Sequence, residues 1–276
     1  MPTPDKTIFT QLAQSIFRSK GIIIPVDWSE PNNQFQEAFK EEDRNVTPNT
    51  PTCLFKEATQ NRYHVDAAKR MSDKFSTFIK KTCHAICDGI EKWLKMASIA
   101  GVTINGSIGT IRPGCVIGPK LQPLILPTAP KKRLQEYKYS YAIAKALSTS
   151  WEPWHLKLSG MILYPSFALF QGSIAPPTAN FPIPIAGLSS SGETQLAPEN
   201  LVALMKANLN DPEALHATEL FDSIAKAFNT IFQTFKTTTI IHNLLGTGPI
   251  PNFVSPLIPA GPVIGGSVLP LPGVII

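Results

Sequence analysis

Apolar positions recur at helical spacing in three long stretches of the chain: 65–97, from Leu134 to Pro153, and 211–237. In each stretch an apolar residue returns every three or four positions, so these side chains form one stripe along a helix. Pro153 is expected to end or bend the second helix, because proline removes a backbone hydrogen-bond donor. A shorter stretch, 198–210, predicts a short helix.

The third long helix has the clearest start. Asp211 is its expected N-cap, Pro212 takes the first helical position, and Glu213 suits the positive end of the helix. Its apolar stripe is rich in phenylalanine and consists of Phe221, Ile224, Phe228, Ile231, Phe232 and Phe235.

After each helix the pattern changes to short strands interrupted by proline and glycine. In the stretch 101–111, isoleucines and a valine stand among small polar residues, and Asn105-Gly106 is a preferred pair for a type I′ hairpin turn. These alternations predict an α+β fold made of helices followed by short β elements.

The same order of elements suggests a division of the chain. We predict an N-terminal arm, 1–64, followed by three helix-plus-β units at 65–130, 131–192 and 193–276. Short strings recur about every 75–80 residues, which makes the units candidates for an internal repeat. The arm is expected to open with a helix that has Thr3 as N-cap and Pro4 in its first position. A short strand is expected at 21–28.

The last 31 residues, from Gly246, contain no Asp, Glu, Lys, Arg or His. They also contain seven prolines, which argue against a membrane-spanning helix, because lipid would leave the interrupted backbone unpaired. The tail should therefore be extended and covered by protein, either by its own chain or by neighbouring subunits. We expect neighbours, and we expect a chain without residues 254–276 to fold but not to assemble. The expected contact residues, which include the hairpin, are Val102, Ile104, Ile108, Phe253, Val254, Leu257, Ile258, Val263, Ile264, Val268 and Leu269.

The low content of charged residues also favours a surface that neighbouring subunits cover. Charged residues make up 16% of the chain, against about 25% in a typical globular protein. The net charge is +5, but the dense basic runs are limited to Lys80-Lys81 and 131–133, with no nucleic-acid-binding motif beside them. We expect no specific nucleic-acid contact.

Four cysteines do not form a disulfide framework in a chain of this length, and the N-terminus has no signal-peptide pattern, so we expect folding in a cytoplasm.

Candidate chemistry is sparse. Cys83, His84 and Cys87 lie close together on the first long helix, but a zinc site needs further converging ligands, and buried free cysteines are common. Trp151 and Trp154, at the end of the second helix, fit aromatic packing better than a ligand site. No catalytic residue, metal ligand or cofactor site is predicted.

The phenylalanine-rich helix and the following "LLGTGPIPNFVSPLIPAGPVIGG" resemble, in composition, virion structural proteins of tailed bacteriophages with contractile tails. The similarity covers mainly residues 215–276, with an echo at 75–119. It implies a non-enzymatic tail, neck or baseplate component, made in the host cytoplasm and assembled with copies of itself and with other structural proteins.

The expected function is therefore that of a structural component of a large, high-order oligomer. One alternative is a membrane-associated or membrane-active protein without a stable membrane span. A second alternative is a metal-binding protein centred on Cys83, His84 and Cys87.

Overall fold

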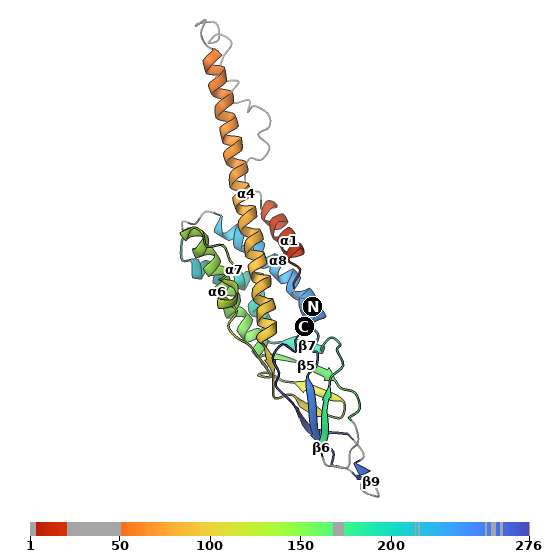
Figure 1. The fold of residues 1–276 in the computed structure, drawn as a ribbon. Helices are drawn as coiled ribbons and strands as arrows, with labels where there is room; N and C mark the ends of the chain where they lie inside the picture. The colour runs from red at the N-terminus through yellow and green to blue at the C-terminus, as the bar shows by residue number, and fades with distance from the viewer. Residues whose placement is uncertain are drawn as a thin grey trace.

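The computed structural model describes residues 4–20, 51–167, 174–212, 214, 216–251, 253–254, 258–259 and 262–275, and for 51–71, 253–254 and 258–259 it describes the backbone alone. Helices pack together at one end of an elongated molecule, and an antiparallel sheet forms the other end (Figure 1). The fold is α+β, as the sequence predicts.

Five helices of more than one turn form the helical part of the described chain. They are α1 (Lys6–Arg18), α4 (Pro51–Met96), α6 (Leu134–Leu156), α7 (Pro198–Leu209) and α8 (Ala217–Thr238). Two short elements, α5 (Gln122–Ile125) and the 3-10 helix η1 (Glu193–Leu196), join them. The apolar stripes predicted for α4 and α8 lie in the core, where Ile86 and Phe228 are almost completely buried.

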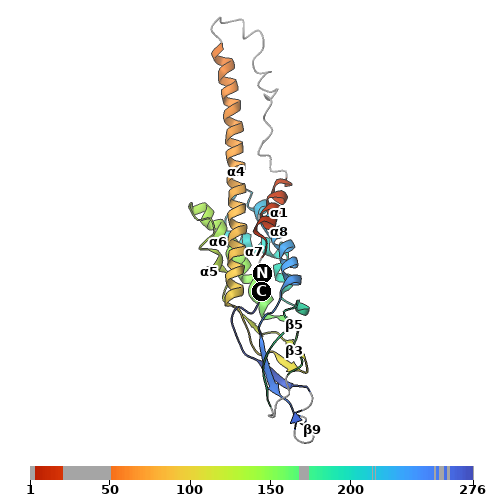
Figure 2. The same cartoon turned by 45° about the vertical axis from the view of Figure 1, so that its right-hand side comes forward.

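Helix α4 is longer than its sequence pattern predicts. It begins at Pro51 instead of near residue 65, and its first half extends past the other helices (Figures 1 and 2). At about 1.5 Å per residue, its 46 residues span roughly 70 Å.

The N-terminal segment does not form a separate arm over its described residues. Helix α1 lies against α8 and α4, with its Phe9 ring centroid 6.3 Å from that of Phe228. Asp5, not Thr3, caps the helix by accepting hydrogen bonds from the backbone N–H groups of Thr7 and Ile8. The strand predicted at 21–28 lies outside the described residues.

A cluster of aromatic rings joins three helices at the sheet end of the bundle. Trp151 and Trp154, both on α6, lie between Trp93 of α4 and Phe232 of α8, with ring centroids 5.3 Å apart for Trp93–Trp151 and 5.1 Å for Trp154–Phe232. The tryptophans pack in the core, as predicted. Pro153 lies within the last turn of α6, which continues to Leu156.

Helix α8 begins later than its sequence signals indicate. Its first residue is Ala217. The N-cap position is occupied by His216, which has a φ of 58°, and not by Asp211 as predicted. Helix α7 ends at Leu209 with Asn210 in the left-handed region, as is common after a helix C-terminus.

Seven strands of the described chain form one antiparallel sheet in the order β6-β8-β11-β2-β3-β5-β7. Their bounds are β2 (Thr103–Asn105), β3 (Ile108–Ile111), β5 (Leu158–Leu163), β6 (Ile174–Ala179), β7 (Ala186–Ser190), β8 (Leu245–Pro249) and β11 (Ile264–Val268). Two small pairs accompany it, β1 (Ser98–Ile99) with β4 (Val116–Ile117) and β9 (Phe253–Val254) with β10 (Ile258–Pro259).

Strands follow each long helix as predicted, but strands from all three predicted units interleave in one sheet. The units are therefore parts of one fold, and their internal repetition remains a prediction.

The predicted hairpin joins β2 and β3, with a different register from the expected one. Asn105 is paired with Ile108, so the two loop residues are Gly106 and Ser107. Only Gly106 has a positive φ, of 65°. A positive φ at the first loop residue alone is typical of a type II′ turn, not of the predicted type I′.

The described part of the C-terminal tail folds onto its own chain. Strand β11 lies inside the sheet, between β8 and β2. Closer to the end, Gly273 donates a hydrogen bond to the Ala97 carbonyl, and His242 donates one to that of Val274. The expectation that neighbouring subunits cover the tail is wrong for its buried residues, such as Val263 and Val268, which pack inside the protomer; for exposed ones, such as Ile264 and Leu269, it stays a prediction. A chain cut at residue 254 would lose an interior strand.

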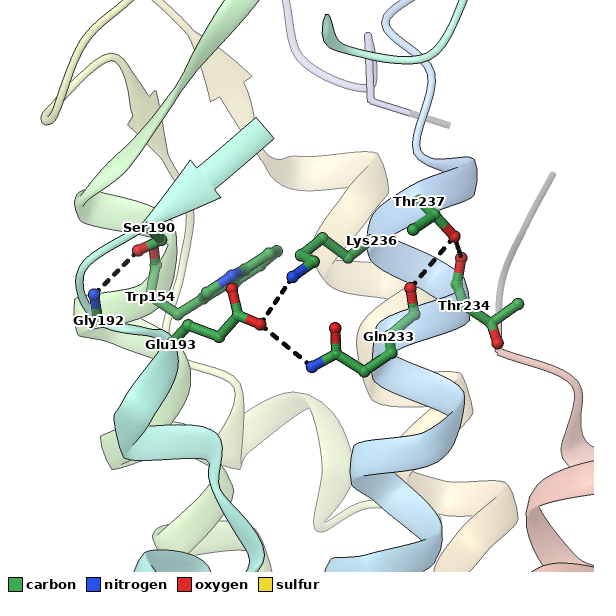
Figure 3. A network of polar contacts seen from close by, with 8 residues as sticks. All are labelled: Trp154, Ser190, Gly192, Glu193, Gln233, Thr234, Lys236 and Thr237. Atoms are coloured by element: carbon green, nitrogen blue, oxygen red, sulfur yellow. Dashed lines mark hydrogen bonds and ion pairs between the residues drawn. The ribbon is translucent and has the colours of Figure 1, made fainter. Parts of the chain in front are cut away.

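The last turns of α8 are fixed to the segment that follows β7 by a polar network (Figure 3). The Glu193 carboxylate accepts hydrogen bonds from Lys236 Nζ at 2.7 Å and Gln233 Nε2 at 3.1 Å. Ser190 Oγ donates to the Trp154 carbonyl and accepts from the Gly192 N–H. These contacts hold one edge of the sheet against α6 and α8.

Candidate interaction surface

In the described part of the chain, charged side chains are concentrated at the helical end of the molecule. None of the described strands contains Asp, Glu, Lys or Arg, and the stretches 97–111, 158–192 and 237–276 contain none of these residues at all. Among the described residues, the charged side chains lie in the helices and in connections between elements. The sheet end therefore presents water with backbone, small polar groups and apolar side chains only.

Strand register separates the residues of the sheet into two faces. Residues paired directly across antiparallel strands point to the same face, and successive residues of one strand alternate. Gly266, Ile104, Gly109 and Ile162 are paired in this order across β11, β2, β3 and β5, and all four are buried. They define the inner face of the sheet.

The inner face is packed so closely that it needs glycine. A Cβ atom on Gly246 would lie 2.5 Å from Ile104 Cδ1, and one on Gly266 would lie 2.7 Å from the Thr247 carbonyl oxygen. Such distances leave no room for a methyl group. Gly246, Gly248 and Gly266 of the tail are thus required by packing inside the protomer.

The opposite face is exposed, and we call it the outer sheet face. Its first row, in paired order, is Ile264, Asn105, Ile108 and Leu163, and its second row is Thr103, Thr110, Met161 and Ala186. The exposed fractions are 50% for Ile264, 41% for Ile108 and 44% for Met161. Leu163 is half-buried. The face thus combines exposed apolar side chains with neutral polar ones, Asn105, Thr103 and Thr110, and carries no charge. Exposed apolar side chains gathered on one uncharged face mark an interaction site more often than single exposed residues do.

The predicted contact residues fall into three groups. Four are buried in the protomer's own fold and cannot contact a neighbour: Val102, Ile104, Val263 and Val268. Three are exposed: Ile108, Ile264 and Leu269. The side chains of Phe253, Val254, Leu257 and Ile258 lie outside the described residues. Sequence reasoning missed Met161 and Leu163, although both lie in the strand-like run "LSGMILY".

The cysteines on α4 are held in an apolar environment. Cys83 and Cys87 are buried free thiols. Burial raises the pKa of Cys83 well above its usual value and raises that of Cys87 to about 12. Within the described chain, no three His, Cys, Asp or Glu side chains converge as metal ligands would.

No helix in the described ranges combines the length and the apolar character needed to cross a membrane. Comparison with protein-family models, with curated proteins and with solved structures gives no match to this chain.

Proposed function

We propose that this chain is a structural component of a large assembly, in which neighbouring copies contact one another through the outer sheet face. The observation that carries the proposal is the charge-free outer sheet face, on which the apolar side chains of Ile108, Met161 and Ile264 are exposed. Burying such surface is favourable by about 25 cal/mol per Å².

A second copy is the partner whose chemistry suits this face best. A partner surface carrying charge would lose hydration there without gaining an opposite charge, which is costly. The outer sheet face of another copy offers apolar side chains and neutral hydrogen-bonding groups. Contact between identical patches is also the usual arrangement in symmetric oligomers.

The particle that we propose is a virion of a contractile-tailed phage, with this chain as a non-enzymatic part of the tail, neck or baseplate, made in the host cytoplasm. The support for this part of the proposal is the compositional resemblance of residues 215–276 to such proteins. Other structural proteins of the particle would be its further partners.

Molar mass in solution tests the assembly role. Light scattering on micromolar protein should give a mass well above the 30.1 kDa of one chain. The double variant Ile108→Lys, Ile264→Lys should give a single-chain mass, because burying a lysine in an apolar contact leaves its charge without water.

A matched control comes from helix α1. Ile8 is 52% exposed, close to the 50% of Ile264, but it lies on the helical end of the molecule. The variant Ile8→Lys should assemble like the unmodified chain. If the unmodified chain has the mass of one protomer, or if all three proteins assemble equally, the proposal fails.

The same exposed face also supports a second candidate, a membrane-associated role. The outer sheet face would then contact lipid, and single chains should float with liposomes in a density gradient. Flotation of the unmodified chain, lost in the Ile108→Lys, Ile264→Lys variant, would favour membrane association over assembly.

A metal-binding role centred on Cys83, His84 and Cys87 is the remaining alternative. It predicts stoichiometric zinc in the purified protein, lost on Cys83→Ser substitution. The burial of both thiols favours a packing role instead.

A further inference from the structure

A groove runs along α4 on the helical part of the molecule. Its volume is about 660 Å³, and its walls are the α4 segment from Asp73 to Asp88 and the segment 127–132 that precedes α6. A smaller hollow of about 330 Å³ continues it toward Phe75 and Tyr139. With 1.5 Å per residue, the α4 wall alone is roughly 22 Å long, or about four helical turns.

The floor of the groove is apolar and aromatic. Phe78 of α4 and Tyr139 of α6 meet edge to face, with ring centroids 6.3 Å apart, and both rings are half-buried. Ala85 and Ala129 are buried beneath the groove. Partly exposed rings on a floor of small side chains suit an apolar helix stripe, which could cover them from water.

Both walls of the groove carry lysines. Lys74 and Lys81 are seven residues apart on α4, which places them on the same side of the helix two turns apart. Lys131 and Lys132 stand on the opposite wall, and all four lysines are exposed. Among the residues that the structure describes, Lys74, Lys81 and Lys132 are in no ion pair.

The carboxylates around the groove only partly offset these lysines. Asp88 is already bound by Lys6, with 2.5 Å between Nζ and Oδ1. Asp73 and Glu136 remain on the lining, so positive charge exceeds negative charge there. The groove therefore combines an apolar floor with a mainly cationic rim.

We propose that this groove binds an acidic amphipathic helix of another polypeptide, about four turns long. The apolar stripe of that helix would cover Phe78 and Tyr139, and acidic residues on its flanks would pair with lysines on both walls. A nucleic-acid strand fits less well, because the two rings already pack edge to face against each other. The inference does not depend on assembly through the sheet.

The first test uses the full chain and a labelled synthetic helix with leucines at helical spacing and glutamates on both flanks. A second peptide has lysine at every glutamate position. Fluorescence anisotropy should show binding of the glutamate peptide, weakening as salt is raised, and no binding of the lysine peptide. Equal binding of both peptides, no binding of either, or tighter binding of an oligothymidylate strand would overturn the proposal.

Charge reversal in the groove gives the second test. The variant Lys81→Glu, Lys132→Glu should bind the glutamate peptide about tenfold more weakly or worse, and it should gain binding to the lysine peptide. The control Lys206→Glu, an exposed position on α7, should bind like the unmodified chain. An unchanged affinity in the groove variant would refute the site. If that variant were misfolded by circular dichroism, the peptide preference and salt dependence of the unmodified chain would decide.

Discussion

Gly266 of β11 is paired with Ile104 of β2 across 162 positions of sequence, and this pair places the C-terminal tail inside the sheet. Ile104 is fully buried, and a Cβ atom on Gly266 would come within 3.2 Å of its Cβ. The apolar, uncharged tail thus contributes an interior strand to the protomer's own sheet, with one side of that strand in the core. What the sheet leaves exposed is its other face, on which Ile264 and Ile108 lie.

Removing the last strand should therefore unfold the sheet. A chain ending at residue 261 lacks β11, so β8 and β2 lose their common neighbour, and the inner face loses Val263 and Val268. We expect loss of the cooperative thermal transition by circular dichroism. Removing Met1 to Thr3 instead, which lie before the α1 cap, should leave the transition unchanged. A truncated chain that melts like the full one would contradict the interior position of β11.

Adding a methyl group to the inner face should also be costly. Gly246→Ala would force a Cβ against Ile104 and Tyr164, and overpacking of this kind costs about 1–3 kcal/mol. Ser267→Ala changes an exposed neighbour in β11 and should have little effect. The comparison is made by urea unfolding of both variants, and equal stabilities would show that the inner face is looser than described.

The contact between Glu193 and Lys236 should contribute to stability at neutral pH. Burial alone would raise the pKa of Glu193, but the hydrogen bonds from Lys236 and Gln233 together lower it below its usual 4.5. A lowered pKa in the folded state gives stability that is present above pH 4.5 and lost as the pH falls through the folded pKa.

Glu193→Gln is therefore expected to lower the free energy of unfolding by about 1 kcal/mol at pH 7 and by less at pH 3. Glu91→Gln, which removes the more exposed pair with Lys95, is the matched control and should change little. Urea unfolding at both pH values measures the difference. An equal effect of Glu193→Gln at pH 7 and pH 3 would rule out the ionised carboxylate as its cause.

The buried thiols should make the protein less stable in alkali. Because burial raises the pKa of Cys87 from 9.0 to about 12, the unfolded chain ionises first as the pH rises. Stability is then lost between about pH 9 and pH 12. Cys87→Ala should flatten this part of the profile relative to the unmodified chain, measured by thermal melting at pH 8 and pH 10. An unchanged profile would mean that the thiol is accessible to water.

Local signals in the sequence predict the helices well, because a buried stripe must repeat at the helical period. The stripe of α4 ends where predicted, and the phenylalanines of α8 are buried. The boundaries are less certain. Asp211 and Pro212 have the chemistry of a helix start, but the chain turns once more at His216, and α8 begins after it.

Long-range pairing could not be read from the sequence. Nothing in the composition of 262–268 indicates that it lies between β8 and β2, since an uncharged apolar strand fits a neighbour's sheet as well as its own. The same ambiguity affected Val102 and Val263, which we expected at a contact between subunits and which are buried within one. Only register distinguishes them from Ile108 and Ile264, and register is a property of the folded sheet.

Electron microscopy of the purified, assembled chain tests the central claim most directly. Averaged images should show protomers joined at their sheet ends, with α4 of each protomer pointing away from the contact. Particles joined through their helical ends, or a field of separate elongated monomers at micromolar concentration, would contradict assembly through the outer sheet face.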